Sequence, residues 1–196
     1  MFHWPTFTAN IRRRVYTTYP AFHALTMSVC AIASARLRDG AVPSPNSSTP
    51  TSDSPPPTSE TFYQAAVASY PRDITTASDF DYKRAKPLLA TLAIQYGQIP
   101  AVHAHIGDYM TLCAIDGFHN ESRWPNDLNE IEVQERRRLV STNLSCPLNT
   151  RADTFCSSGS HISLTYTPRQ LGELLSVIVN HSPPFCIQPK STRTKK

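Results

Sequence analysis

Apolar residues recur at helical spacing along this chain, in segments that begin near a proline and end at a glycine. One such segment runs from Tyr19 to Leu37, with Pro20 in its first turn and Gly40 just after its end. A helix tolerates proline in its first turn, where the missing N–H would have no helical partner, and glycine readily adopts the left-handed backbone that often follows a helix. The pattern predicts an all-α protein.

Other segments have the same signature. We expect further helices over residues 60–70, 79–96, 100–116 and 128–139. Ser78 and Asp81 resemble a capping box at the start of the second of these, and Gly97 and Gly117 should close the second and third. Pro87 lies inside the 79–96 pattern, so a kink or a break into two pieces is expected near it.

The packing faces of these helices can also be predicted. In the 19–37 helix, residues at intervals of three and four positions form a face of small side chains suited to close helix packing. They are Ala24, Met27, Cys30, Ala31, Ser34 and Ala35. An apolar stripe on the 79–96 helix consists of Phe80, Leu88, Leu89, Leu92 and Tyr96.

Residues 42–59 interrupt the helical pattern. This stretch is nearly all proline, serine and threonine, with no apolar periodicity, so burial cannot offset the entropy lost on ordering it. We expect a disordered insertion there. The 17 prolines in 196 residues leave room for one modest core.

The cysteines and the apolar runs indicate the compartment. The five cysteines are far apart, with no CxxC pair, which favours a reducing interior over a disulfide framework. They are Cys30, Cys113, Cys146, Cys156 and Cys186. No run approaches the ~18 apolar residues of a membrane span, and the N-terminus turns from aromatic to basic, unlike a secretory signal. We expect no membrane partner and a location in the cytosol or nucleus.

The net charge of +4 is concentrated in a few places. Part of it lies in the tail, at Lys190, Arg193, Lys195 and Lys196. Two basic triplets, Arg12–Arg14 and Arg136–Arg138, are candidates for phosphate contacts or import signals. The second alternates with Glu132 and Glu135, which favours a solvated, salt-bridged helix face, so Arg12–Arg14 is the better candidate.

Histidines and acids suggest two kinds of chemistry. His103 and His105, with Cys113 and His119 nearby, suggest a metal site, but residues two apart on a helix point roughly 200° away from each other. Asp108, Asp116, Glu130 and Glu132 suggest acid–base pairs, but no nucleophile elbow, phosphate-cradling glycine loop or HExxH accompanies them. We assign no catalytic, cofactor-binding or metal residue and expect no enzyme.

The two tryptophans, Trp4 and Trp124, are each followed by proline. Proline favours extended backbone in the residue before it, which predicts that both tryptophans lie on connections between helices. Core packing is the preferred interpretation of both rings, and anchoring on a partner surface is the alternative.

Four segments carry a resemblance to a known family. They are FHWPTF (Phe2–Phe7), YPAFHALTMSVCAIASARL, the pair LLATLAIQYGQ and HIGDYMTLCAIDGFHNES, and ERRRL (Glu135–Leu139). In this order and spacing they resemble the fungal-specific transcription factor domain, the helical middle region downstream of a zinc binuclear cluster, of the xylanolytic or quinate-activator type.

The resemblance implies an all-α regulatory domain of nuclear transcription, acting through masking, effector response or contacts with other regulatory proteins or the full-length factor. It implies that zinc and DNA are bound by a separate cluster of six closely spaced cysteines. This chain has no counterpart of that cluster, so we expect it to hold no cofactor and to meet DNA only through the missing part.

The chain departs from the family after Leu139. There ERRRL normally continues into Phe-Trp and a long helix, but here Val140-Ser141 follows, which GTAAGT, a common splice-donor sequence, can encode. A pyrimidine-rich stretch ending in TGCAG can encode residues 155–157, and the shifted frame beyond it can read FWVTYQPHVYS. We therefore expect residues 1–139 to be a partial regulatory domain and residues 140–196 to be an intron read-through and a frameshifted, disordered tail without function.

A truncated bundle should leave some apolar side chains partly uncovered and prone to aggregation. We expect this of Leu88, Leu92, Ile106 and Met110. Two other functions stay open: a stand-alone interaction or decoy fragment, and a small helical enzyme or ligand-binding protein. The last would need a polar-lined pocket within residues 1–139.

Overall fold

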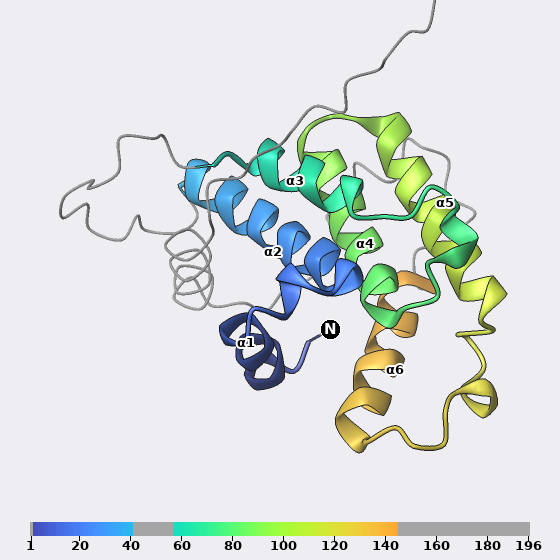
Figure 1. Cartoon of the computed structure of the whole chain (residues 1–196). Helices are drawn as coiled ribbons and strands as arrows, with labels where there is room; N and C mark the ends of the chain where they lie inside the picture. Colours follow the sequence, from blue (N-terminus) through green and yellow to red (C-terminus); the bar gives the residue numbers. More distant parts are fainter. Residues whose placement is uncertain (1, 41–56, 145–196) are drawn as a thin grey trace, which may run out of the picture.

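The computed structural model describes residues 2–40 and 57–144, and every regular element in this part of the chain is helical (Figure 1). The α-helices are α1 (Trp4–Arg12), α2 (Pro20–Arg38), α3 (Ser59–Ala68), α4 (Phe80–Gln95), α5 (Ile99–Ile115) and α6 (Glu130–Leu144). Short 3-10 turns are η1 (Val15–Thr17), η2 (Ile74–Thr76) and η3 (Glu121–Arg123). The all-α prediction is confirmed. Most of the expected insertion and residues 145–196 lie outside the described residues.

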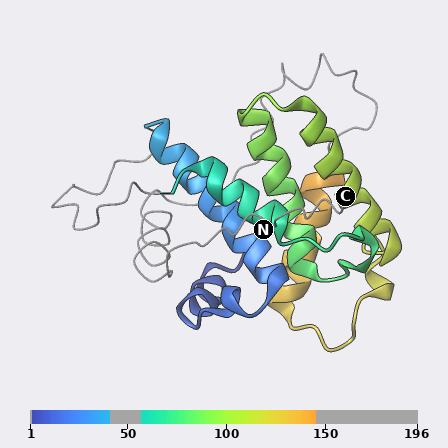
Figure 2. The ribbon, with the colours of Figure 1, turned by 45° about the horizontal axis from the view of Figure 1, so that its top comes forward.

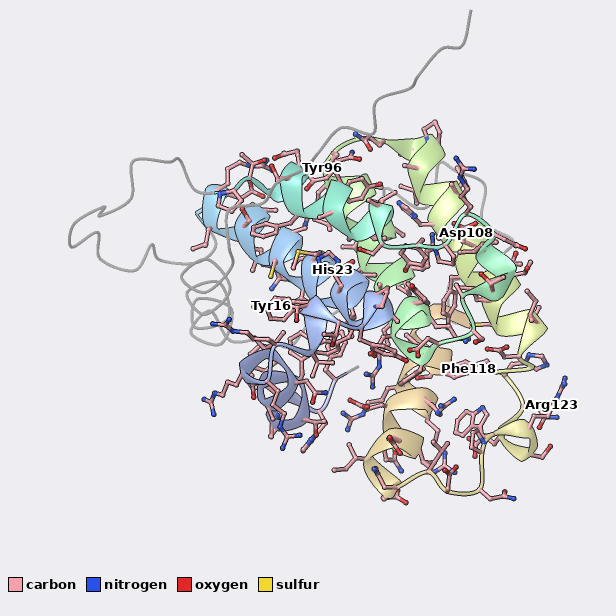
Figure 3. The ribbon with its side chains drawn as sticks, viewed as in Figure 1. Tyr16, His23, Tyr96, Asp108, Phe118 and Arg123 are labelled. Carbon is pink, nitrogen blue, oxygen red and sulfur yellow. The ribbon has the colours of Figure 1, made fainter. Side chains whose placement is uncertain are left out.

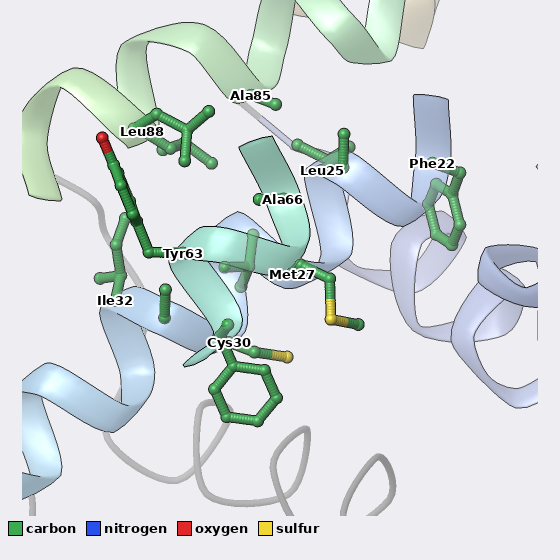
Figure 4. Close-up of a cluster of buried hydrophobic side chains, with 14 of the residues drawn as sticks. Phe22, Leu25, Met27, Cys30, Ile32, Tyr63, Ala66, Ala85 and Leu88 are labelled. Carbon is green, nitrogen blue, oxygen red and sulfur yellow. The ribbon is translucent and has the colours of Figure 1, made fainter. Parts of the chain in front are cut away.

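Helix α2 forms the centre of the fold, with α3 lying along it and α4 packed on another side (Figures 1 and 2). Leu25, Met27 and Cys30 of α2 are completely buried, and they share a core with residues of α3 and α4 (Figure 4). Of the expected small-residue face, only Ser34 is not fully buried. Small side chains let the helix axes approach closely, so α2 contacts two neighbours at once.

Helix α4 passes through Pro87 without interruption, so the expected break near Lys86 is wrong. Proline removes one backbone hydrogen bond, but Leu88, Leu89 and Leu92 just after it are completely buried and hold the helix against α2. The cap is also one residue later than expected: the carboxylate of Asp79, not Ser78, accepts from the amide of residue 81 at 2.9 Å.

Four helices end in the same way, with a left-handed residue two positions after the last helical one. After α2, α4 and α5 this residue is Gly40, Gly97 or Gly117, as the sequence predicts. After α1 it is Arg14, with φ +57°. Arg14 is the one residue with a side chain that has a positive φ in the described part of the chain.

Helix α1 was not expected, and Trp4 begins it instead of lying in an extended connection. The prediction for Trp4 is therefore wrong. The preference of a residue before proline for extended backbone is a bias that packing can overcome. Here the Trp4 ring lies 5.7 Å from the ring of Phe7, which in turn lies 5.5 Å from the ring of Phe22 in α2.

Helix α6 begins at a reciprocal cap. The side chain of Asn129 accepts from the amide of Glu132 at 3.0 Å, and the carboxylate of Glu132 accepts from the amide of Asn129. The helix runs to Leu144, past Leu139 where it was expected to end. Val140, the first residue of the expected tail, packs against the cluster around the fully buried Leu139, which accounts for the continuation.

The apolar side chains expected to be uncovered behave in two ways. Leu88 and Leu92 are completely buried, so the prediction is wrong for them, because α2 and α3 already cover this face of α4. Ile106 and Met110 on α5 are half-buried, as expected. No helix in the described ranges is long and apolar enough to cross a membrane.

Candidate functional site

Arginine side chains alternate with aromatic rings where the start of the chain, α4, α6 and the connection before α6 meet. This arginine–aromatic stack consists of Phe2, Arg84, Phe80, Arg136, Phe118 and Trp124. The guanidinium carbon of Arg84 lies 4.0 Å from the ring centre of Phe80 and 5.5 Å from that of Phe2. A guanidinium over an aromatic face is attracted by the ring quadrupole, most strongly where water is excluded.

Arg136 forms the other half of the stack. Its guanidinium carbon lies 4.7 Å from the ring centre of Phe80 and 5.4 Å from that of Phe118. Burial among these rings lowers the pKa of Arg136, while Glu132 on the same helix opposes the shift. The solvated ion-pair face expected for Arg136 is therefore wrong, because the guanidinium turns inward onto the rings.

Glu135 joins three elements at this place. Its carboxylate accepts from the backbone amide of His3 and from the guanidinium of Arg84, and it forms the partner of Arg84 in a largely buried ion pair. Arg84 also pairs with Asp81 at 3.0 Å. Burial raises the pKa of Asp81 to about 6, against the lowering effect of Arg84. Two carboxylates thus share one guanidinium.

Two lysines of α4 tie this helix to α5. Lys83 is 2% exposed and pairs with Asp116. Lys86 pairs at 2.7 Å with Asp108, which lies on α5 (Figure 3). The Lys86 ammonium also lies 3.9 Å from the ring centre of Tyr70. Buried charges need such partners, because an unpaired ammonium would lose its hydration without compensation. Asp108 and Asp116, considered as acids or bases, are thus held as ion-pair partners.

The two other candidate acids lie at the start of α6. Glu132 closes the helix cap, and Glu130 accepts from the side-chain amide of Gln134 at 2.8 Å. Each of the four candidate acids therefore has a partner of its own. Glu130 and Glu132 lie at the start of α6 and do not pair with Asp108 or Asp116 as an acid and a base.

The histidines considered as metal ligands do not converge. His105 is buried, with Nε2 2.8 Å from the Tyr63 hydroxyl, whereas His103 and His119 are exposed. Burial lowers the pKa of His105 to about 4, and the nearby charge of Lys86 adds to the effect. Cys113 is buried beside α6. The described residues contain no group of three or more potential ligands placed to hold a metal ion.

Trp124 behaves as the sequence predicts. Its backbone is extended, on the connection between η3 and α6, and its indole N–H donates to the carbonyl oxygen of Phe118 at 2.8 Å. Next to it, Arg137 makes two hydrogen bonds, 2.9 and 2.8 Å long, to the carboxylate of Glu121 on the surface. In the second basic triplet, Arg136 thus faces inward, whereas Arg137 and Arg138 are exposed.

Two hollows open on the described surface. One, of about 180 Å³ between α5 and α6, is lined mainly by apolar side chains, including Met110, Phe118 and Val140. The other, of about 360 Å³, lies at the start of α2 beside Tyr16 and His23 (Figure 3). Most residues that line the second hollow carry polar side chains, but this hollow lies open at the surface, whereas a small-molecule site usually buries most of its ligand.

A histidine and a serine do meet at the second hollow, with His23 Nδ1 2.6 Å from the hydroxyl oxygen of Ser69. The Ser69 hydroxyl donates its proton to the carbonyl oxygen of Ala65 at 2.7 Å. His23 must therefore be the donor in the first contact, which is the reverse of what a general base does to a nucleophilic serine.

Arg12–Arg14, the better electrostatic candidate in the sequence, is exposed at the end of α1 and in the turn after it. None of the three arginines forms an ion pair with another residue of the described chain. Comparison with family models, curated proteins and solved structures gives no match to this chain.

The residues that sequence reasoning missed are the cations of α4: Lys83, Arg84 and Lys86. Their signal was present, since three charges stand close together in a helix whose other half is leucine and alanine. Charges that share a helix with a buried apolar stripe need partners from other elements. The aspartates of the 100–116 helix and Glu135 offered such partners.

Proposed function

We propose that this chain is a partial regulatory domain of a fungal zinc-cluster transcription factor, the helical region that acts in the nucleus without reading DNA sequence itself. One observation carries the proposal: Glu135 in ERRRL contacts His3 in FHWPTF. Two segments on which the resemblance rests, at opposite ends of the matched region, are thus parts of one packed junction.

Phe118 extends this support to a third segment. It belongs to HIGDYMTLCAIDGFHNES and stacks with Arg136 of ERRRL. A resemblance built from residues with no contact to one another would be weaker support for a shared domain than one whose residues meet in space.

In this proposal the junction positions surfaces and performs no chemistry. The arginine–aromatic stack and Glu135 hold α6 and the start of the chain on α4, and α4 is tied to α5 through Lys83 and Lys86. Regulatory partners, or the full-length factor, meet the outer faces of α5 and α6. Zinc and DNA are bound by the separate cysteine cluster of the full-length protein.

The proposal includes the origin of residues 140–196 as intron read-through and a frameshifted tail. Sequencing the transcript across the codons for Glu135–Thr167 tests it. A message that lacks the stretch after Leu139 and continues into Phe-Trp supports both the read-through and the family. If abundant message retains the stretch, the truncated chain is made in the cell, the gene-model error is ruled out, and the decoy alternative becomes the one to test.

The alternative is a stand-alone interaction or decoy fragment. It is favoured by the closure of the core within the described residues, since Leu88, Leu92 and Leu139 are all completely buried. A pull-down of the full-length factor with this chain tests it. Retention by the wild-type chain and loss with Glu135→Ala would support the decoy, with Glu121→Ala on the surface as the matched control. Failure of the wild-type chain to retain the factor would rule it out.

A further inference from the structure

Arg14 stands where this chain otherwise uses glycine. At the ends of α1, α2, α4 and α5 the amide of the left-handed residue donates to the carbonyl three residues before it, with lengths between 2.9 and 3.1 Å. Three of the four residues are glycines, and the fourth is Arg14. A side chain in this conformation brings its Cβ too close to backbone, so folding alone favours glycine there. The arginine side chain therefore points to a role other than folding.

The surroundings of Arg14 contain no acid along the chain. The first 38 residues include five arginines, no lysine and no aspartate or glutamate. The acids that other elements bring against this stretch meet His3, Tyr19 and Arg38. Among the described residues Arg12–Arg14 thus has no acidic partner and can meet an external anion, whereas Arg38, Arg84 and Arg137 form ion pairs.

The arrangement suits a row of separate anions better than a single one, because the three side chains spread apart. Adjacent positions on a helix point about 100° apart, so Arg12 and Arg13 diverge, and the left-handed turn at Arg14 directs the chain away from the helix. A guanidinium is a planar fork that can bind phosphate oxygens in pairs, which a lysine ammonium cannot do. Three exposed forks without acids nearby match a dense row of phosphates better than a peptide with scattered carboxylates.

We propose that Arg12–Arg14, the arginine corner, binds the phosphodiester backbone of nucleic acid without reading its bases. The arginine corner supplies charge and donors but no element that could enter a groove, so its contacts position the chain and carry no sequence information. The inference goes beyond the proposed function, since it concerns an activity of this chain alone and holds whatever the parent protein is.

The test is fluorescence anisotropy of the full chain with a short labelled DNA duplex, between about 50 and 200 mM salt. The triple variant Arg12→Gln, Arg13→Gln, Arg14→Gln should bind the duplex roughly tenfold more weakly, or weaker still. It should also reduce the slope of log affinity against log salt by about 2 to 3. Arg14→Gly alone should reduce the slope by about 1 while leaving the thermal midpoint unchanged or higher.

A tail variant with Lys190→Gln, Arg193→Gln and Lys195→Gln is the matched control, because it removes the same charge elsewhere. A slope unchanged in this control supports the arginine corner. An equal loss in the tail variant, or no loss in the corner variant, overturns the proposal. Binding of polyglutamate as tight as that of the duplex also overturns it, because the surface would then recognise acidic protein.

Discussion

The backbone amide of His3 donates to the carboxylate of Glu135, which lies 132 residues further along the chain. The same carboxylate pairs with Arg84 in the middle of the sequence. One side chain therefore connects both ends of the described chain to α4. Because Glu135 and Arg84 are each about 12% exposed, this connection is formed away from bulk water, where removal of one partner has a large effect.

Glu135→Ala should lower the free energy of unfolding by about 3 kcal/mol, since it leaves Arg84 buried with Asp81 as its remaining partner. Glu135→Gln keeps the acceptor and should cost about half as much. Urea unfolding followed by circular dichroism measures both. The control Glu121→Ala breaks a surface pair and should hardly change the midpoint. Equal effects of Glu135→Ala and Glu121→Ala would show that the junction is not energetically important.

His105 should make stability fall in acid. Its pKa is lowered to about 4 in the fold, so the unfolded chain binds more protons below its usual pKa of 6.5. The contribution of neutral His105 to the free energy of unfolding is complete above pH 6.5. It is lost as the pH falls to 4, and the loss is at most about 3 kcal/mol. His105→Gln should remove this part of the pH dependence. An unchanged stability profile in that variant would contradict the assignment.

Asp81 should act in the opposite direction. Its pKa is raised to about 6 in the fold, so the folded chain binds the proton more tightly between pH 3.8 and 6. Stability from this group therefore falls as the pH rises through this window. Asp81→Asn should remove that fall and expose the rise caused by His105. Unfolding curves at pH 4, 5 and 6 would show a steeper rise in this variant than in the wild-type chain, and a shallower one would be inconsistent with it.

Arg14→Gly should stabilise the fold by roughly 0.5–1 kcal/mol, because glycine adopts the left-handed backbone without the steric cost that arginine has there. Differential scanning calorimetry would detect a rise of a few degrees. Gly97→Ala makes the converse change at the end of α4, where an added Cβ would meet no atom within 4 Å. Gly97→Ala should therefore lower the stability of the fold only through the strain of a positive φ, and not through a steric clash with a neighbouring residue. A lower midpoint for Arg14→Gly would mean that its side chain contributes to folding.

Leu139→Ala should destabilise by about 2–5 kcal/mol, because Leu139 is completely buried between α6 and α5. The cavity should also weaken the packing of α6 on α5. Limited proteolysis should then cleave the variant faster than the wild-type chain within residues 130–144. Ile131→Ala on the same helix is the control, since Ile131 is 43% exposed and should tolerate truncation. Similar losses for the two variants would argue against the packing of α6 described above.

The helices could be predicted because their limits are local. Pro20 and Gly40 fix the ends of α2 through the conformations that these two residues adopt, and no other part of the chain is needed. The predicted break at Pro87 is wrong for the opposite reason. Whether a helix continues through proline depends on how firmly the flanking turns are packed, which here is decided by α2.

The candidate site could be predicted only in part. The surface exposure of Arg12–Arg14 follows from local composition, but the pairing of Arg84 with Glu135 depends on where α6 lies relative to α4. No periodicity records that relationship. For the same reason the sequence could not show that Arg136 turns inward onto the rings. Glu132, four residues earlier, is equally compatible with a solvated ion pair on the helix surface.

The burial of α2 on several sides has a consequence for synthesis on the ribosome. When α2 has just left the exit tunnel, the residues of α3 and α4 that cover Leu25, Met27 and Cys30 have not yet emerged, because they follow only after residues 41–56. Until Leu92 has emerged, an apolar helix is exposed in the cell. α2 is therefore the segment of this chain on which chaperones should first act.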